Sequence, residues 1–158
     1  MGVICTCGVL VQNPQNPNDE AVSNNNNVRF VGQTGTVNGN LFYMADVCVT
    51  RLATSSLSLR FEENVTTPPG PNNFTFTATS ITSVVCNQEG QNCSITVTGT
   101  GTVSGQSGTF AFEAVFRDMV GQAQVDNVQS FVITGFFNQT GAAPIDQGSI
   151  IAQGCQEL

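Results

Sequence analysis

The sequence predicts an all-β protein: an antiparallel β-sandwich of about eight strands, jelly-roll-like, with an extended N-terminal arm. Two observations support this prediction. Apolar residues alternate with Thr, Ser and Gly through most of the chain, which is the period of a strand with one buried face. Clusters of Gly, Pro, Asn and Ser interrupt these runs at intervals of about 8 to 12 residues, the usual spacing of turns in sandwiches.

The N-terminal region is predicted to lie outside the folded body. Residues 1–11 form an apolar arm that carries Cys5 and Cys7 and is too short to span a bilayer. No basic residue precedes Arg29, so the arm has no recognisable secretory signal. Residues 12–27 are rich in Asn and Pro and bury too little surface to offset their ordering entropy. We therefore expect a flexible linker over 12–27 and a β-sandwich domain over 28–158.

The first half of the domain is expected to begin with a hairpin. Its two strands, 28–37 and 41–50, flank Asn38-Gly39, and Asn-Gly is the strongest two-residue turn signal. The motif GTVNG that ends at Gly39 returns as GTVSG at 101–105, which suggests equivalent hairpins in two halves of a sandwich. Further strands are predicted on either side of a Pro-rich turn, over 55–62 and 74–86.

The clearest element is a long hairpin over 94–117. Ile95, Val97, Phe110, Phe112 and Phe116 give it one apolar face, and Gly and Ser break the run in its middle. A hairpin this apolar needs other strands to cover it. The run 128–137 is the most apolar strand, and a last short strand is expected to end at Cys155. No segment is predicted to form a helix.

Composition excludes several classes of function. The chain has 158 residues, a formal net charge of -7, no His and no Lys, so a polyanion such as nucleic acid would be repelled. Nucleophilic catalysis by Ser or Cys usually needs a His or Lys base. We therefore expect no enzymatic activity, no cofactor and no metal site.

Two carboxylate-based alternatives stay open. A paired-carboxylate glycosidase could use Glu113, Asp118 or Asp126, but such sites normally stack sugars on Trp or Tyr. The chain has no Trp and one Tyr, and the same scarcity argues against a sugar-binding module. Calcium could be bound by Asp118, Asp126 or Asp146 with loop carbonyls, yet no EF-hand loop is present and solvated turn acids are favoured.

The cysteine count indicates disulfides. The even number of cysteines, without His or a C-x-x-C pair, favours disulfides in an oxidising environment over zinc. Cys86 and Cys93 flank a turn, so they are the best candidates for an intramolecular disulfide. The six cysteines are Cys5, Cys7, Cys48, Cys86, Cys93 and Cys155.

Two functions from different classes follow from this organisation. A Cys-bearing strand on a flexible arm, with Cys48 and Cys155 on the body, suggests strand addition to a neighbouring subunit and covalent locking. The protein would then be a structural subunit that assembles with itself. Alternatively, the arm folds back and bridges to its own body, and the protein is a monomeric extracellular adhesion or ligand-binding module.

The plan of a Cys-containing N-terminal connector, a polar spacer and a Gly/Thr/Phe-rich sandwich resembles the subunits of bacterial endospore appendage fibres and other leaderless spore-surface proteins. The resemblance implies a jelly roll whose arm residues Cys5 and Cys7 bond to Cys48 or Cys155 of other subunits. It also implies a homopolymeric fibre or coat in an extracellular or spore-surface location, in contact with other spore-surface or cell-surface proteins.

Overall fold

The computed structural model describes residues 7–67, 70–119 and 125–153, and these residues are mostly β-strand. The all-β class predicted from the alternation is confirmed. The elements are β1 (Gly8–Val11), β2 (Ala21–Phe30), β3 (Val37–Cys48), the 3-10 helix η1 (Val49–Thr54), β4 (Ser56–Glu63), β5 (Phe74–Glu89), β6 (Asn92–Val103), β7 (Phe110–Asp118), β8 (Asp126–Ile133), β9 (Phe137–Gln139), β10 (Ala143–Ile145) and β11 (Ile150–Gln153).

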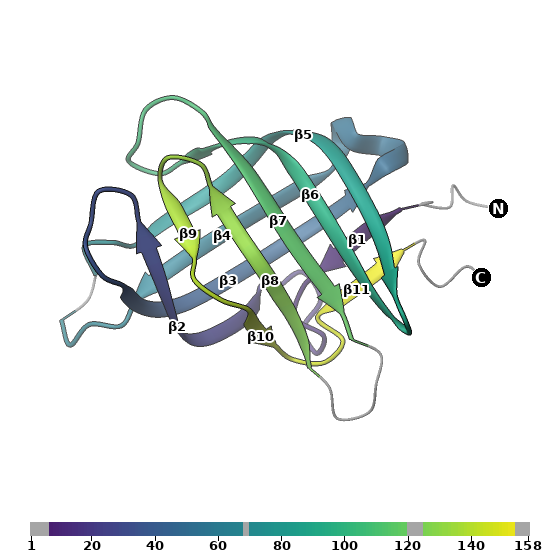
Figure 1. Cartoon of the computed structure of the whole chain (residues 1–158), viewed down its shortest axis with the longest axis horizontal. Helices are drawn as coiled ribbons and strands as arrows, with labels where there is room; N and C mark the ends of the chain where they lie inside the picture. Colours follow the sequence, from purple (N-terminus) through teal and green to yellow (C-terminus); the bar gives the residue numbers. More distant parts are fainter. Residues whose placement is uncertain (1–6, 68–69, 120–124, 154–158) are drawn as a thin grey trace.

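The sheet closes into an antiparallel barrel of eight strands, β2 to β9, in which neighbours in sequence are neighbours in space (Figure 1). Pairing of β9 with β2, from Val28 opposite Gln139 to Phe30 opposite Phe137, completes the ring. The prediction of an open, jelly-roll-like sandwich is therefore wrong. Alternation shows that each strand buries one face, but it does not distinguish two packed sheets from one sheet closed on itself.

The barrel interior is filled by side chains, as expected for about eight strands. The largest fully buried side chains include Phe61, Phe76, Phe116, Phe131 and Phe137. One polar pair crosses this apolar interior: the hydroxyl of Tyr43 donates a hydrogen bond to Oε1 of Gln139. Nε2 of Gln139 donates to the carbonyl oxygens of Val128 and Gly141, each at 2.7 Å, so the buried amide is satisfied on both sides.

Glycines on β6 let this strand lie close against β5. A Cβ at Gly99 would lie 2.1 Å from the carbonyl oxygen of Ser80, and one at Gly101 would lie 2.4 Å from that of Thr77. The register of the β5–β6 pair shifts twice in the same region, between Ala78 and Ser80 and again after Ile81. Bulges and glycines together allow a strand pair to bend strongly, which a small closed barrel requires.

The first hairpin differs from its prediction, whereas the central one is confirmed. Asn38 and Gly39 lie inside β3, and the turn from β2 to β3 covers 31–36. A Cβ at Gly39 would lie 2.5 Å from the ring of Phe61, so this glycine makes room for an aromatic side chain instead of forming a turn. The GTVNG motif leads into β3 and GTVSG leaves β6, so the two motifs are not equivalent. β6 and β7 form the long hairpin predicted over 94–117.

The described part of the N-terminal arm belongs to the sheet of its own chain. β1 pairs with β3 on one side and with β11 on the other, and Val9 and Val11 are 1% and 0% exposed. β2 begins at Ala21, so the predicted linker is wrong over 21–27, where the chain is a strand. The boundary expected at residue 28 therefore falls within a barrel strand.

The Asn tract is ordered by amide hydrogen bonds on the outer wall of the barrel. Nδ2 of Asn38 donates to Oδ1 of Asn27 at 3.1 Å, and Nδ2 of Asn64 donates to Oδ1 of Asn25 at 3.1 Å and of Asn38 at 2.6 Å. Asn25 adopts a φ of 60°, within the bulge where the β2–β3 register shifts. Hydrogen bonds to Asn38 on β3 and to Asn64 after β4 thus order the tract, which has few apolar side chains to bury.

The only helical segment of the described residues is η1, which the sequence did not predict. It connects β3 to β4 and packs beside β5. No helix among the described residues has the length and apolar character needed to cross a membrane.

Replacing Gly99 by Ala is expected to lower the free energy of unfolding by about 1–3 kcal/mol, because the new methyl group would overlap the backbone of β5. Gly141→Ala is the matched control, since nothing lies within 4 Å of the Cβ position at Gly141. Urea unfolding followed by circular dichroism measures both. Equal losses in the two variants would contradict the close approach of β5 and β6.

Candidate functional site

The two ends of the barrel are built differently (Figure 1). At one end, here called the mouth, lie the connections from β2 to β3, β4 to β5, β6 to β7 and β8 to β9. At the other end, here called the base, β1 and β11 pair as a short ribbon beside the ends of β3 and β7. Because the interior of this barrel is filled by side chains, a ligand site would lie at an open end.

A cavity of about 410 Å³ opens at the mouth, within the range of small-molecule sites. Its floor consists of Phe30, Phe74 and Phe136, whose rings pack edge to face. The ring centroids of Phe74 and Phe136 are 5.0 Å apart, and those of Phe30 and Phe136 are 5.5 Å apart. Phe30 and Phe74 are only 6% and 5% exposed, whereas Phe136 is half-buried. Phe136 is therefore the ring that a ligand can reach best.

The rim of this mouth cavity carries uncharged polar side chains. The side chains that line the cavity include no Asp, Glu, Lys or Arg, and their polar groups are amides and one hydroxyl. Nε2 of Gln33 donates to Oδ1 of Asn72 at 2.9 Å, which joins two of the connections across the rim. The polar lining residues are Gln33, Asn72, Asn73, Ser104 and Gln106.

Hydrogen bonds to the strands hold the rim in place. Oε1 of Glu63, at the end of β4, accepts from the backbone N–H of Asn72 at 3.2 Å and from its Nδ2 at 3.1 Å. Oδ1 of Asn73 accepts from the N–H of Glu63 at 2.7 Å. Ser104 exchanges two hydrogen bonds of 2.9 Å with the backbone of Thr75. Asn72, Asn73 and Ser104 are thus positioned before any ligand binds, which lowers the entropy lost on binding.

A second hollow, of about 470 Å³, lies against the outer wall near β1, β3, β4 and β5. Met44, Ser58 and Thr77 lie opposite one another across three strands and face away from the barrel interior. Asp46 in this hollow is paired with Arg51 at 2.8 Å. No comparable set of connections converges on it, so the mouth cavity is the better candidate site.

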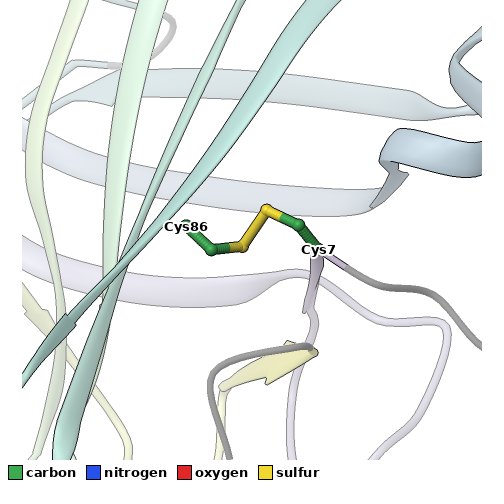
Figure 2. The surroundings of a disulfide bond; sticks show 2 residues. All are labelled: Cys7 and Cys86. Atoms are coloured by element: carbon green, nitrogen blue, oxygen red, sulfur yellow. A yellow bond between two sulfur atoms is a disulfide. The ribbon is translucent and has the colours of Figure 1, made fainter. Parts of the chain in front are cut away.

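The structure joins Cys7 to Cys86 within one chain, with Cα atoms 5.8 Å apart (Figure 2). The predicted Cys86–Cys93 disulfide is therefore wrong. In the β5–β6 ladder Cys86 lies opposite Ile95, and Cys93 lies opposite Gln88, so the two cysteines are offset along the strands. Cys48 and Cys93 are also disulfide-bonded, and no described cysteine is free. Of the predicted intersubunit candidates, Cys5 and Cys155 lie outside the described residues.

The Cys7–Cys86 disulfide joins the residue before β1 to β5, and these two strands do not pair with each other. β4 pairs with β5 only from Phe74 to Thr77, and Cys86 lies farther along β5, where β4 no longer accompanies it. Cys7 directly precedes β1, so the bond ties the base ribbon to this part of β5. It closes a long loop in the unfolded chain, with a sequence separation of 79.

Replacing both Cys7 and Cys86 by Ser is expected to lower the free energy of unfolding by about 4 kcal/mol, because a loop of this length loses much entropy on cross-linking. Urea unfolding without reductant measures the loss. The wild-type protein treated with reductant provides the control and should lose at least as much. An unchanged midpoint in the double variant would contradict a bond that fixes the arm to its own barrel.

Asp118 and Asp126 bind backbone amides at the edge of β11. Asp126 is 0% exposed and accepts from the N–H groups of Met119 at 2.9 Å, Gly148 at 3.1 Å and Ile150 at 2.8 Å. Asp118 accepts from the N–H of Ala152 at 2.9 Å. Burial raises the pKa of the Asp126 carboxyl, and nearby Asp118 raises it further, although the backbone hydrogen bonds oppose this shift.

These carboxylates therefore cap a strand edge. The N–H groups of alternate β11 residues, which a further strand would bond, bond instead to carboxylates of β7 and β8. Glu113 lies exposed on β7, and Asp146 is exposed before β11. Among the described residues no three acidic or Cys side chains come together in a group that could hold a metal ion.

Replacing Asp126 by Asn is expected to cost about 1–3 kcal/mol of unfolding free energy, because the amide nitrogen cannot accept the hydrogen bond that a carboxylate oxygen accepts. The folded pKa lies above the ordinary 3.8, so the contribution of Asp126 is largest below that value and falls as pH rises through the folded pKa. The difference between wild type and variant should therefore be larger at pH about 3 than at pH 7.

Asp146→Asn is the control for this pH comparison, because Asp146 is exposed. Chemical unfolding at several pH values gives both differences. A difference for Asp126→Asn that shrinks as pH falls would show that the backbone hydrogen bonds outweigh burial at this carboxyl.

No family model, curated protein or solved structure matches the chain. The assignment of the mouth cavity as a candidate site therefore rests on its geometry alone. None of the residues that line this cavity was predicted as a site residue, although the sequence contains one signal for them. Phe30 ends a strand and Phe74 begins one, so each lies beside a polar turn, where a buried aromatic residue can contribute to an end of the barrel.

Proposed function

We propose that the protein is a monomeric binding module that holds a small uncharged ligand in the mouth cavity and does not catalyse its conversion. The observation that carries this proposal is the fixed, uncharged polar rim above an aromatic floor. Convergent polar groups in an apolar concave site are the usual features of ligand recognition. An oxidising, extracellular location belongs to the same proposal, and the Cys7–Cys86 disulfide is consistent with it.

Charge supports an uncharged ligand. An anion would meet no Arg or Lys in the lining, and the net charge of -7 would repel it. A cation would find no carboxylate among the side chains that line the cavity. The lining also lacks a His, Lys or carboxylate that could serve as a general base, which supports binding without turnover.

Self-assembly as a fibre or coat subunit of the spore-appendage kind is the second candidate. One observation favours it: beyond Thr77, β5 has no strand partner on the side of β4 within the described residues. Such an edge can accept a strand from a neighbour. Two observations weigh against assembly by the arm: β1 pairs within its own sheet, and Cys7 is bonded within its own chain.

The test is a screen of uncharged fragments observed through backbone amide chemical shifts. Perturbations are expected to gather in the mouth connections, and Phe136→Ala should weaken the best fragment about tenfold through loss of ring contact, or about 1.4 kcal/mol. Gln129→Ala is the control, since Gln129 is exposed on the wall of β8. Fragments that perturb only the wall, or none that bind, would contradict the proposal.

Sedimentation and non-reducing electrophoresis of the same sample distinguish the two candidates. A single species of 16.6 kDa is expected for the binding module. Ladders that collapse on addition of thiol would favour the assembly subunit instead.

A further inference from the structure

We propose that the ligand of the mouth cavity is a neutral carbohydrate, bound through one or two sugar rings. This inference rests on the proposed binding function and names its ligand class. It follows from three features of the cavity: the hydrogen-bonding groups left available on the rim, the small area of accessible aromatic surface, and the enclosure of the site.

The rim offers both donors and acceptors. Within the described part of the chain, the side chain of Gln106 has no hydrogen-bond partner, and Oε1 of Gln33 and Nδ2 of Asn73 also remain available. Asn72 is already bonded through both of its side-chain groups, so its main role is to position the rim. A sugar hydroxyl is at once a donor and an acceptor, and amide side chains match it without any charge.

The aromatic surface is too small for a wholly apolar ligand. Phe30 and Phe74 are almost completely covered, and Phe136 is the floor ring that is half-buried. A sugar ring presents one face of C–H groups, which can pack on the negatively polarised face of an aromatic ring. The scarcity of Trp and Tyr argued against sugar binding, but the connection after β8 supplies a half-buried phenylalanine, Phe136, that lines the cavity.

The shape of the cavity favours a compact ligand over an extended one. Lining residues come from all four mouth connections, so they surround the cavity on several sides. An extended peptide would need an open groove or a free strand edge. The volume of about 410 Å³ lies toward the lower end of small-molecule sites, which suits one or two sugar rings.

The experiment titrates the full chain with neutral sugars: glucose, galactose, N-acetylglucosamine, cellobiose and lactose. Titration to about 50 mM covers the millimolar affinities expected of single small sites. At least one sugar is expected to cause saturable amide shifts at Gln33, Asn73 and Gln106. Gln106→Ala should weaken that sugar about tenfold, whereas Gln129→Ala should leave its affinity unchanged.

Phe136→Leu tests the aromatic contact without emptying the floor, because Leu retains an apolar side chain but has no ring face. It should weaken sugar binding severalfold while the protein keeps its folded spectrum. No saturable shift with any of the sugars, or shifts that Gln106→Ala leaves unchanged, would overturn the carbohydrate proposal. Uncharged fragments that bind the mouth when no sugar does would leave the binding module standing with a different ligand. If neither class binds there, both proposals fall.

Discussion

The pairing of β9 with β2 is the constraint on which the rest of the structure depends. It involves only three residue pairs, yet it turns an open meander into a ring in which each strand pairs with both of its neighbours over part of its length. The Tyr43–Gln139 hydrogen bond supports this short contact from inside, since Gln139 belongs to β9 and Tyr43 to β3. Closure also creates the mouth, because it brings Phe136, beside β9, against Phe30 at the end of β2. The site is thus a consequence of the same contact that completes the fold.

The base of the barrel gives this arrangement its rigidity. β1 and β11 cover the end opposite the mouth, and their inward side chains are buried with the core. Three different interactions hold the ribbon: the ladder to β3, the Cys7–Cys86 disulfide, and the carboxylates of Asp118 and Asp126. The ladder holds the outer edge of β1, the carboxylates hold the outer edge of β11, and the disulfide holds the residue that precedes β1, so loss of one leaves the ribbon attached. A barrel fixed at its base can hold the mouth connections in one arrangement, which favours binding without induced fit.

Local pattern was sufficient for the strands but not for their closure. The alternation of the hairpin over 94–117 identified its buried face, since a strand in any all-β architecture buries one face in this way. The predicted turn at Asn38-Gly39 is wrong because Gly39 makes room for the ring of Phe61. This is a contact with the neighbouring strand β4, which the dipeptide alone does not reveal. The prediction that the Asn tract is a linker is wrong for a similar reason, because its side-chain amides bond to residues distant in sequence. The mouth cavity could not be predicted at all, because its floor residues are distant in sequence and meet only after closure.

The same tertiary contacts determine where a neighbour could add a strand. Edges are a hazard in β proteins, and this chain protects them unequally. The outer edge of β11 is capped by Asp118 and by the buried Asp126, so an incoming strand there would have to displace both carboxyl groups from the N–H groups of β11. The free side of β5 lacks such caps, but the register shifts near Ser80 and Ile81 bend it, and a bent edge pairs poorly with a regular strand. Assembly through backbone pairing would therefore have to use the straighter part of β5 near Cys86, where the disulfide to Cys7 already places the chain's own arm alongside. A strand added there would have to pass the Cys7–Cys86 disulfide, so this bond restricts the free edge of β5 although no described strand pairs with it.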